Sequence, residues 1–298
     1  MVTPKNILLA AMLVLTAVYV AVWVSAVRAR RARGGDAESA SPGILHLAIG
    51  FVTNFFDTLG IGSFATTTTL YRLRRLVPDQ LIPGTLNVGH TPPTIVQALI
   101  YITIVEVEFQ TLLLLIIAAV GGSWIGAAIV SGLPRAQIQR GMGVALLVAA
   151  LLMVATALML LPLGGAALGL TGGKLILAVG INFALGALMT LGIGAYAPIM
   201  IMVSLLGMNP TAAFPIMMGS CAFLMPVASM QFVRKNKYHL RAALGLGLGG
   251  MPAVLVAALI VRSLPLAYVR WLVVIVVLYA AITLLRASVT EKSAHATA

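Results

Sequence analysis

Long apolar stretches with very few charged side chains constrain this chain more than any other feature. They cover residues 7–27, 83–105, 109–132, 139–162, 213–233, 241–261 and 266–286. Each is close to the roughly 20 residues that a helix needs to cross a bilayer. With 61% hydrophobic and 9% charged residues and a mean hydropathy of +1.07, the chain carries more apolar surface than a soluble fold buries. The short alternating segments of a membrane barrel are absent, so we expect an all-α polytopic membrane protein.

Two further apolar runs are interrupted by glycines. TLGIGSFA (58–65) and TLGIGAYA (190–197) each place two glycines one residue apart, although glycine costs a helix about 1 kcal/mol relative to alanine. The offset between these motifs also aligns Pro78 with Pro210 and Pro83 with Pro215. We therefore predict two copies of one unit, each with a broken run (44–71 and 175–206) followed by three transmembrane helices.

The positions of the basic residues indicate how the broken runs sit in the membrane. The segment RARRAR (28–33) follows the first apolar run, as expected for its cytoplasmic end. If both broken runs crossed the bilayer, Arg72, Arg74, Arg75, Arg135 and Arg140 would lie outside. If each is a re-entrant hairpin, most Lys and Arg stay inside, which the positive-inside rule favours.

The hairpin interpretation gives the two copies opposite orientations, with the N-terminus outside and the C-terminus in the cytoplasm. Inverted repeats with interrupted helices are the architecture of many secondary transporters. The expected organisation is a first transmembrane helix (1–27), a cytoplasmic basic linker (28–43), repeat 1 (44–163), an extracytoplasmic linker (164–173), repeat 2 (174–286) and a cytoplasmic polar tail (287–298).

A broken helix offers the backbone N–H groups at the start of its second half to a ligand. That end carries about half a positive charge, so two converging ends predict a site for a small anion. The candidate substrate-binding residues are Thr58, Gly60, Gly62, Ser63, Thr66, Asn87, His90, Thr190, Gly192, Gly194, Gly219, Ser220 and Cys221. The alternative for the hydroxyls is bonding to their own helix, and the alternative for the asparagines is contact between helices.

Asp57 lies directly before the first TLGIG motif, inside an apolar run. A carboxylate at bilayer depth costs about 2.5–3.5 kcal/mol, and burial favours its protonated form. We therefore assign Asp57, with Asn54, a coupling or gating role. The alternative is an acid near the hairpin mouth, paired with His90 or an arginine. The aligned residue in the second copy is Met189, so the repeat itself does not require an acid there.

Five segments together resemble the TauE/SafE sulfite exporter family (TSUP permeases). They are GFVTNFFDTLGIGSFA (50–65), INFALGALMTLGIGAYAP (181–198), the later Pro…Gly-Ser-Cys segment and the LPRAQIQR and LPLAYVR starts of the last helix of each copy. The family break is GxGGG-like and is followed by a proline. Pro198 matches this proline, whereas Thr66 replaces it in the first copy. The resemblance implies a plasma-membrane carrier for sulfite, thiosulfate, sulfoacetate or other organosulfonates.

The leading hypothesis is a secondary transporter that works by alternating access, with a proton or sodium ion as co-substrate. An anion channel on the same scaffold and a structural or sensory membrane protein remain as alternatives. HExxH, a nucleophile elbow, a cluster of metal ligands and Walker A are all missing from the sequence, which predicts no enzyme, no metal and no cofactor. The single cysteine, Cys221, is expected to pack in the core. Besides the anion, the bilayer is the expected partner; nucleic acid is not, and a homodimer is left open.

Overall fold

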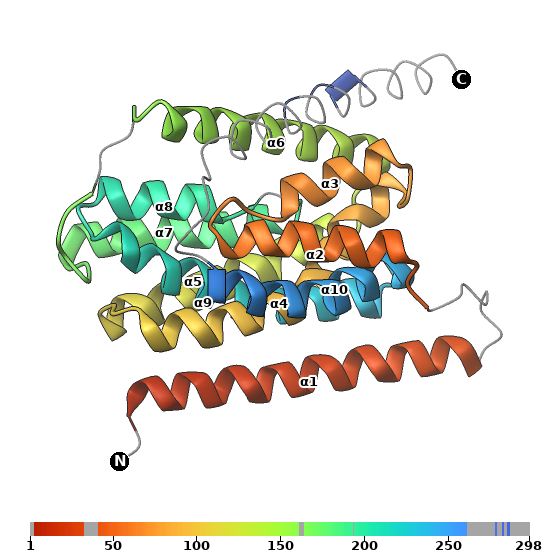
Figure 1. The fold of residues 1–298 in the computed structure, drawn as a ribbon, viewed down its shortest axis with the longest axis horizontal. Coiled ribbons are helices and arrows are strands. Elements are labelled where there is room, and N and C mark those ends of the chain that lie inside the picture. The colour runs from red at the N-terminus through yellow and green to blue at the C-terminus, as the bar shows by residue number, and fades with distance from the viewer. Residues whose placement is uncertain are drawn as a thin grey trace.

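The computed structural model describes residues 3–32, 41–160, 164–192 and 194–260, and the single positions 278, 282, 285 and 286. These residues form α-helices joined by short loops and two 3₁₀ turns (Figure 1). The elements are α1 (Pro4–Ala32), α2 (Ile44–Thr58), α3 (Phe64–Leu73), η1 (Asp79–Leu81), α4 (Ile82–Ile104), α5 (Phe109–Val130), α6 (Arg135–Ala157), α7 (Gly172–Met189), α8 (Tyr196–Leu205), η2 (Pro210–Ala212), α9 (Ala213–Arg234) and α10 (Leu240–Ile260).

The order of elements repeats along the chain. Two helices, a 3₁₀ turn and two long helices run from α2 to α5, and the same order runs from α7 to α10. The predicted helix 266–286 and the tail 287–298 lie outside the described residues, apart from four positions, and the linker residues 33–40 lie outside them too. Within the linker predicted at 28–43, residues 28–32 belong to α1.

Five of the described helices are long and apolar enough to cross a membrane, which makes the chain a multi-pass membrane protein. They are α1, α5, α7, α9 with its preceding 3₁₀ turn, and α10. We also predicted that α4 and α6 cross, but neither is in this set. The helix α4 is less apolar because it carries a row of threonine, asparagine, histidine and glutamine side chains, which are buried against protein. Conversely, α7 is long enough to span although we predicted it as one limb of a broken run.

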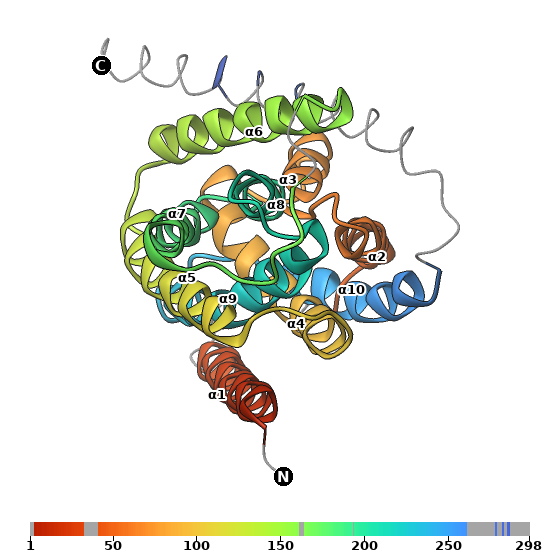
Figure 2. The ribbon, with the colours of Figure 1, turned by 90° about the vertical axis from the view of Figure 1, so that its left-hand side faces the viewer.

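Helix packing is the same around both broken runs. The most extensive contacts pair α2 with α10, α7 with α5, α4 with α9, α5 with α9 and α10 with α4. The helices α2, α3, α4 and α5 correspond in order to α7, α8, α9 and α10. When each helix is replaced by its counterpart, the same five pairs result. Viewed from one end, α5 and α7 lie on one side, α2 and α10 on the other, and α1 lies outside the bundle (Figure 2).

Glycines allow the backbones in these pairs to touch. A Cβ atom on Gly186 would collide with the Ala119 backbone, and one on Gly50 would collide with Gly245. Small residues of this kind are what membrane helices use for close packing. Asn182 serves the same interface, because its Nδ2 donates to the Leu115 carbonyl at 2.6 Å. Asn182 is therefore a contact between α7 and α5.

Both broken runs fold back on themselves. In Figure 1, α3 runs back over α2 toward the end where α2 begins. Tyr71 of α3 donates to the Ala242 carbonyl of α10. His46, at the start of α2, packs on Gly245 of α10, about one turn further along, so the end of α3 lies near the start of α2. In the second run, the ammonium of Lys174, at the start of α7, donates to the carbonyl of Leu206, at the end of α8.

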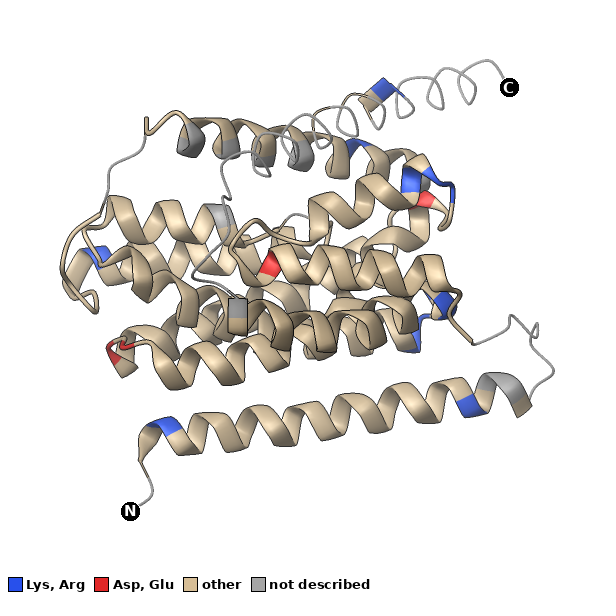
Figure 3. Cartoon of the chain, in the orientation of Figure 1, with Lys and Arg blue, Asp and Glu red and all other residues tan. Residues whose placement is uncertain are grey.

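Charged side chains lie mainly at the two ends of the bundle, and Lys and Arg gather at one of them (Figure 3). At that end, Arg72 and Gln139 both bind the Asp79 carboxylate, and Lys235 donates to the last turn of α5. At the other end, Glu108 accepts hydrogen bonds from the first amides of α5 and from the Thr111 hydroxyl. Partial burial alone would raise the pKa of Glu108, but these hydrogen bonds lower it overall.

Candidate functional site

The two chain breaks have matching backbone geometry. Gly60, Gly62 and Gly192 have φ values of +83°, +91° and +96°, a region that a side chain disfavours. The turn bonds agree as well, since the Gly60 amide bonds the Asp57 carbonyl and the Gly192 amide bonds the Met189 carbonyl. Glycine therefore occurs at these positions because the chain must leave the helix within the bundle. Ile193, between the two glycines of the second break, lies outside the described residues.

Both second halves begin without a side-chain cap. Ser63 stands at the N-cap of α3 and Ala195 at the N-cap of α8, and neither side chain bonds the first turn. The first amides of a helix then depend on other partners. Because both helix starts lie inside the protein, their positive ends face a common interior region.

That region is a narrow cavity of about 10 Å³ between the two breaks. Its wall is made by Asp57, Gly62, Ser63, Phe64, Thr94, Met189, Gly194, Ala195 and Tyr196. The two breaks touch here, since a Cβ on Gly194 would lie 3.9 Å from the Cβ of Phe64. In this conformation the cavity is far smaller than the roughly 300–1,000 Å³ of ordinary ligand pockets, with room for about one water-sized group.

A hydrogen-bond network forms the polar wall of the cavity. Gln97 of α4 donates through Nε2 to Asp57 Oδ2 and to Thr58 Oγ1, both at 3.0 Å. Its Oε1 accepts from the Tyr196 hydroxyl at 2.8 Å. Tyr101 adds a bond from its hydroxyl to the Thr58 carbonyl. Gln97 thus joins the acid of the first hairpin to the first residue of α8.

A second network holds the first hairpin against α4. Asn54 Nδ2 donates to the Gly50 carbonyl, so its Oδ1 is the acceptor for His90 Nδ1 at 2.9 Å. His90 Nε2 then accepts from the Thr67 hydroxyl at 3.0 Å. Both ring nitrogens are used, which assigns His90 the Nδ1-protonated neutral form and a role in joining α2, α3 and α4. The partners of Asp57 are accordingly Gln97 and Ser63, and not His90 or an arginine.

The predicted site residues separate into three groups. Asp57, Gly62, Ser63 and Gly194 line the cavity. Gly60 and Gly192 form the turns beside the cavity, and the Thr58 hydroxyl accepts a hydrogen bond from Gln97. The remaining predicted residues make other contacts and do not line the cavity; they are Asn54, Thr66, Asn87, His90, Thr190, Gly219, Ser220 and Cys221.

The contacts of this third group are mostly structural. The hydroxyls of Thr66 and Thr190 donate to carbonyls of their own chain segment, at Ser63 and Ala187. Ser220 accepts from Asn182, and Gly219 is enclosed by aliphatic side chains. Buried Cys221 lies with its Sγ 3.6 Å from the sulfur of Met189, a cavity residue.

The structure adds residues that were not on the predicted list: Phe64, Thr94, Met189, Ala195 and Tyr196 line the cavity, and Gln97 bonds two of the residues that line it. Thr94 and Gln97 belong to the polar stretch 83–97, but the stretch alone does not tell which of its polar side chains face the breaks. Phe64, Ala195 and Tyr196 follow the glycine motifs, and Tyr196 aligns with Phe64 between the copies. Met189 occupies the place that corresponds to Asp57. The repeat offset, which aligns Phe64 with Tyr196 and Asp57 with Met189, was thus the signal that could have identified both pairs of residues.

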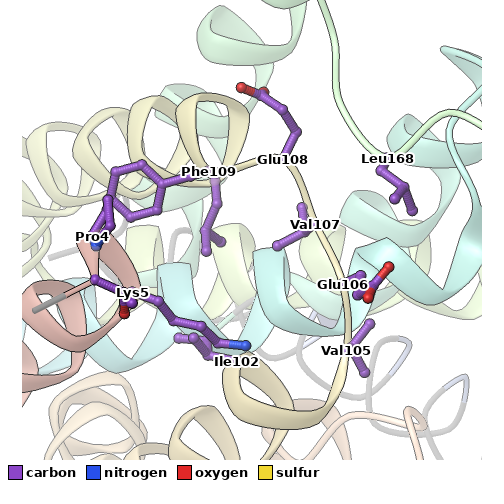
Figure 4. A pocket seen from close by; sticks show the side chains of 11 residues that line it. Pro4, Lys5, Ile102, Val105, Glu106, Val107, Glu108, Phe109 and Leu168 are labelled. Carbon is purple, nitrogen blue, oxygen red and sulfur yellow. The ribbon is translucent and has the colours of Figure 1, made fainter. Parts of the chain in front are cut away.

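A larger, more open pocket lies between the start of α1 and the α4–α5 loop (Figure 4). Two of its charged side chains already have structural partners, because Lys5 donates to the Thr103 carbonyl and Glu108 caps α5. Both helix breaks lie elsewhere, so we assign the candidate site to the smaller cavity. Within the described residues, no three His, Cys, Asp or Glu side chains come together as metal ligands would.

Comparison with known proteins gives one match. Residues 2–153 match a family described as sulfite exporter TauE/SafE. The match runs from α1 through most of α6 and includes the first hairpin. It begins before the first of the segments that carry the resemblance (50–65), and it stops before the second copy. No curated protein and no solved structure matches the chain.

Proposed function

The chain belongs to the sulfite exporter TauE/SafE family, and on that basis we propose that it is a secondary transporter of a small sulfur-containing anion across the plasma membrane. The substrate class is sulfite, thiosulfate, sulfoacetate or another organosulfonate. The observation that carries the proposal is the meeting of two glycine breaks at one buried cavity.

The cavity suits an anion because of what surrounds it. The uncapped first turns of α3 and α8 offer amide N–H groups and the positive ends of two helix dipoles. The Thr94 hydroxyl lies at the wall as a further donor, whereas the Tyr196 hydroxyl is bound to Gln97 and the Ser63 hydroxyl to Asp57. Among the described residues, no lysine or arginine lines the cavity, so an anion is held by neutral donors and can also leave. The cavity is too narrow for an oxyanion while it is closed, so the two breaks must move apart to admit one.

Asp57 supplies a reason for proton coupling. An ionised carboxylate beside a bound anion is repelled, by about 4 kcal/mol at 4 Å for an effective dielectric constant of 20. A protonated Asp57 removes this repulsion and turns the group into a donor. Anion binding and protonation of Asp57 therefore favour each other, and the pair crosses together. Sodium is the alternative co-substrate, which the experiment below distinguishes.

The same geometry supports alternating access between two inverted units. The hairpin α2–α3 packs on α10, and the hairpin α7–α8 is joined through α7 to α5, with α4 and α9 between them. We propose that the hairpins enter from opposite faces, with the N-terminus outside and the C-terminus in the cytoplasm. The glycine-lined contacts of α2 with α10 and of α7 with α5 let each hairpin tilt as a body, so that the cavity opens to one face at a time.

Flux into proteoliposomes tests this function. Radiolabelled or optically detected sulfite, thiosulfate and sulfoacetate are compared with chloride and sulfate, with a proton gradient, a sodium gradient or neither. We expect saturable uptake of at least one sulfur oxyanion, driven by the proton gradient. Unitary currents that do not saturate at millimolar anion would instead identify a channel. The absence of flux for every anion would favour a structural or sensory protein.

A further inference from the structure

A long apolar groove runs along the outside of the bundle between α1, α4 and α10. Val20, Val24 and Arg28 of α1 line it on one side, and Leu244 and Leu248 of α10 line it on the other, with Ile95 of α4 at its base. The remaining lining is also predominantly apolar. This α1–α10 groove is separate from the central cavity, and the proposed transport function does not use it.

The groove exists because α1 leans on only part of the bundle. Its main contacts are with α9, and its buried hydrophobic side chains are Leu8, Met12, Tyr19 and Trp23. Tyr19 donates to the Val88 carbonyl, and Trp23 donates to the Tyr238 hydroxyl. The neighbouring Val20 and Val24 point away from this contact, with exposed fractions of 44% and 41%.

The groove has the length and polarity of one lipid leaflet. It extends along α1 from Thr16 to Arg28, which is roughly 18 Å at 1.5 Å per residue. Half of a hydrocarbon core is about 15 Å. Arg28 stands at one end of the groove only, at the end of the bundle where Lys and Arg gather (Figure 3). The Trp23–Tyr238 pair lies about one turn before Arg28, at the depth where aromatic side chains meet lipid headgroups.

Arg28 lacks an acidic partner among the described residues. Asp57 is buried at the central cavity, and Asp79 is bound by Arg72 and Gln139. Glu106 and Glu108 lie at the start of α5, at the opposite end of the bundle. A second copy of the chain in the same membrane orientation brings only Asp79, of the described acids, to the end of the bundle where Arg28 lies, and that carboxylate is already bound. A lipid phosphate at this level carries a negative charge that Arg28 can bind.

We propose that the α1–α10 groove binds one anionic phospholipid, with an acyl chain along Val20, Val24 and Leu248 and its phosphate against Arg28. The guanidinium offers a phosphate two parallel N–H donors, which a zwitterionic headgroup satisfies less well because its own cation competes. One arginine near an anionic surface corresponds to about a fivefold preference for anionic over zwitterionic lipid.

Native mass spectrometry of the purified full chain tests the proposal. The protein is released from nanodiscs that contain equal amounts of phosphatidylglycerol and phosphatidylcholine, and the retained lipids are counted. We expect one retained lipid, with about a fivefold excess of phosphatidylglycerol. Arg28→Gln should bring the ratio close to one, whereas Arg74→Gln, an exposed arginine at the same end but outside the groove, should leave it unchanged.

A second pair of variants tests the position of the acyl chain. Val24→Trp fills the groove and should lower retention of both lipids, whereas Val18→Trp places the same ring on an exposed part of α1 outside the groove. Circular dichroism confirms that both variants keep their helix content. Equal retention in the two tryptophan variants would overturn the proposal. So would a wild-type ratio of one, or a Val24→Trp variant that loses a dimer while its retained lipid is unchanged.

Discussion

The Tyr196 hydroxyl lies 2.8 Å from Gln97 Oε1 and donates a hydrogen bond to it, while Gln97 Nε2 donates to the Asp57 carboxylate. One amide side chain therefore connects the start of α8 with the end of α2. Because these two helices belong to different hairpins, a movement of either hairpin changes the hydrogen bonding of the same acid. In the proposed mechanism, this arrangement would couple proton binding at Asp57 to the movement of the hairpins.

Replacing Asp57 by asparagine should remove the dependence of anion flux on the proton gradient. The amide keeps the size of the side chain but neither ionises nor repels an anion, so binding should stay within about threefold of wild type, less than 1 kcal/mol. Flux with and without a pH gradient measures the effect. Asp79→Asn is the matched control, because Asp79 lies at the end of the bundle beside Arg72 and Gln139. Persistent proton drive in Asp57→Asn would exclude this acid from coupling.

The bond between Tyr196 and Gln97 should contribute measurably to stability. Tyr196→Phe and Gln97→Leu are each expected to cost about 1–3 kcal/mol, since each leaves a buried polar partner unpaired. Combined, they should cost about 1 kcal/mol less than their sum. Unfolding in detergent gives these values. Tyr71→Phe, whose hydroxyl bonds the Ala242 carbonyl, serves as control and should be additive with Gln97→Leu. Strict additivity of the first pair would argue against a direct bond.

Leucine in place of Gly60 or Gly192 should abolish anion binding. Both positions have positive φ, where a side chain costs about 1–2 kcal/mol, and both form the turn beside the cavity. Gly180→Leu tests the same change in the same hairpin as Gly192, at a position with no atom within 4 Å of a new Cβ. Equilibrium anion binding should be normal in this control. Wild-type anion affinity in both variants would show that the two turns contribute to helix packing and not to anion binding.

Glu108→Gln should destabilise the protein in a pH-dependent manner. The folded state lowers the pKa of Glu108 from its ordinary value of 4.5, so its stabilising effect is present above that value and is lost as the pH falls through the folded pKa. The difference at pH 7 should be about 0.5–1 kcal/mol, the lower part of the range for N-caps, because solvent screens the exposed side chain. Unfolding at pH 7 and at pH 3 checks this. A difference that persists at pH 3 would point to lost packing.

The sidedness of the hairpins can be measured by cysteine labelling. In a Cys221→Ser background, Ser41→Cys and Arg74→Cys should react with an impermeant maleimide from one face of sealed vesicles. Thr171→Cys and Thr211→Cys, which flank the second hairpin, should react from the other face. Labelling of Ser41→Cys and Arg74→Cys from opposite faces would mean that the first broken run crosses the bilayer.

Sequence patterns predicted the helical membrane class and the position of both breaks well, because hydropathy and glycine at positive φ act locally. The structure starts α3 one residue after Ser63 and α8 one residue after Ala195. The sequence patterns predicted the roles of individual side chains less well. Asn182 donates both to Ser220 and to the α5 backbone, which depends on how α7, α9 and α5 pack. Gln97 became central because α4 turns this one amide toward both hairpins.

The most direct test of the account is a cryo-electron microscopy structure with the transported anion at saturating concentration. We predict density for the anion between the first turns of α3 and α8, within hydrogen-bonding distance of the Ser63 and Ala195 backbone and next to Asp57. Anion density elsewhere, such as in the pocket beside Lys5 and Phe109, with the space between the two breaks empty, would contradict it.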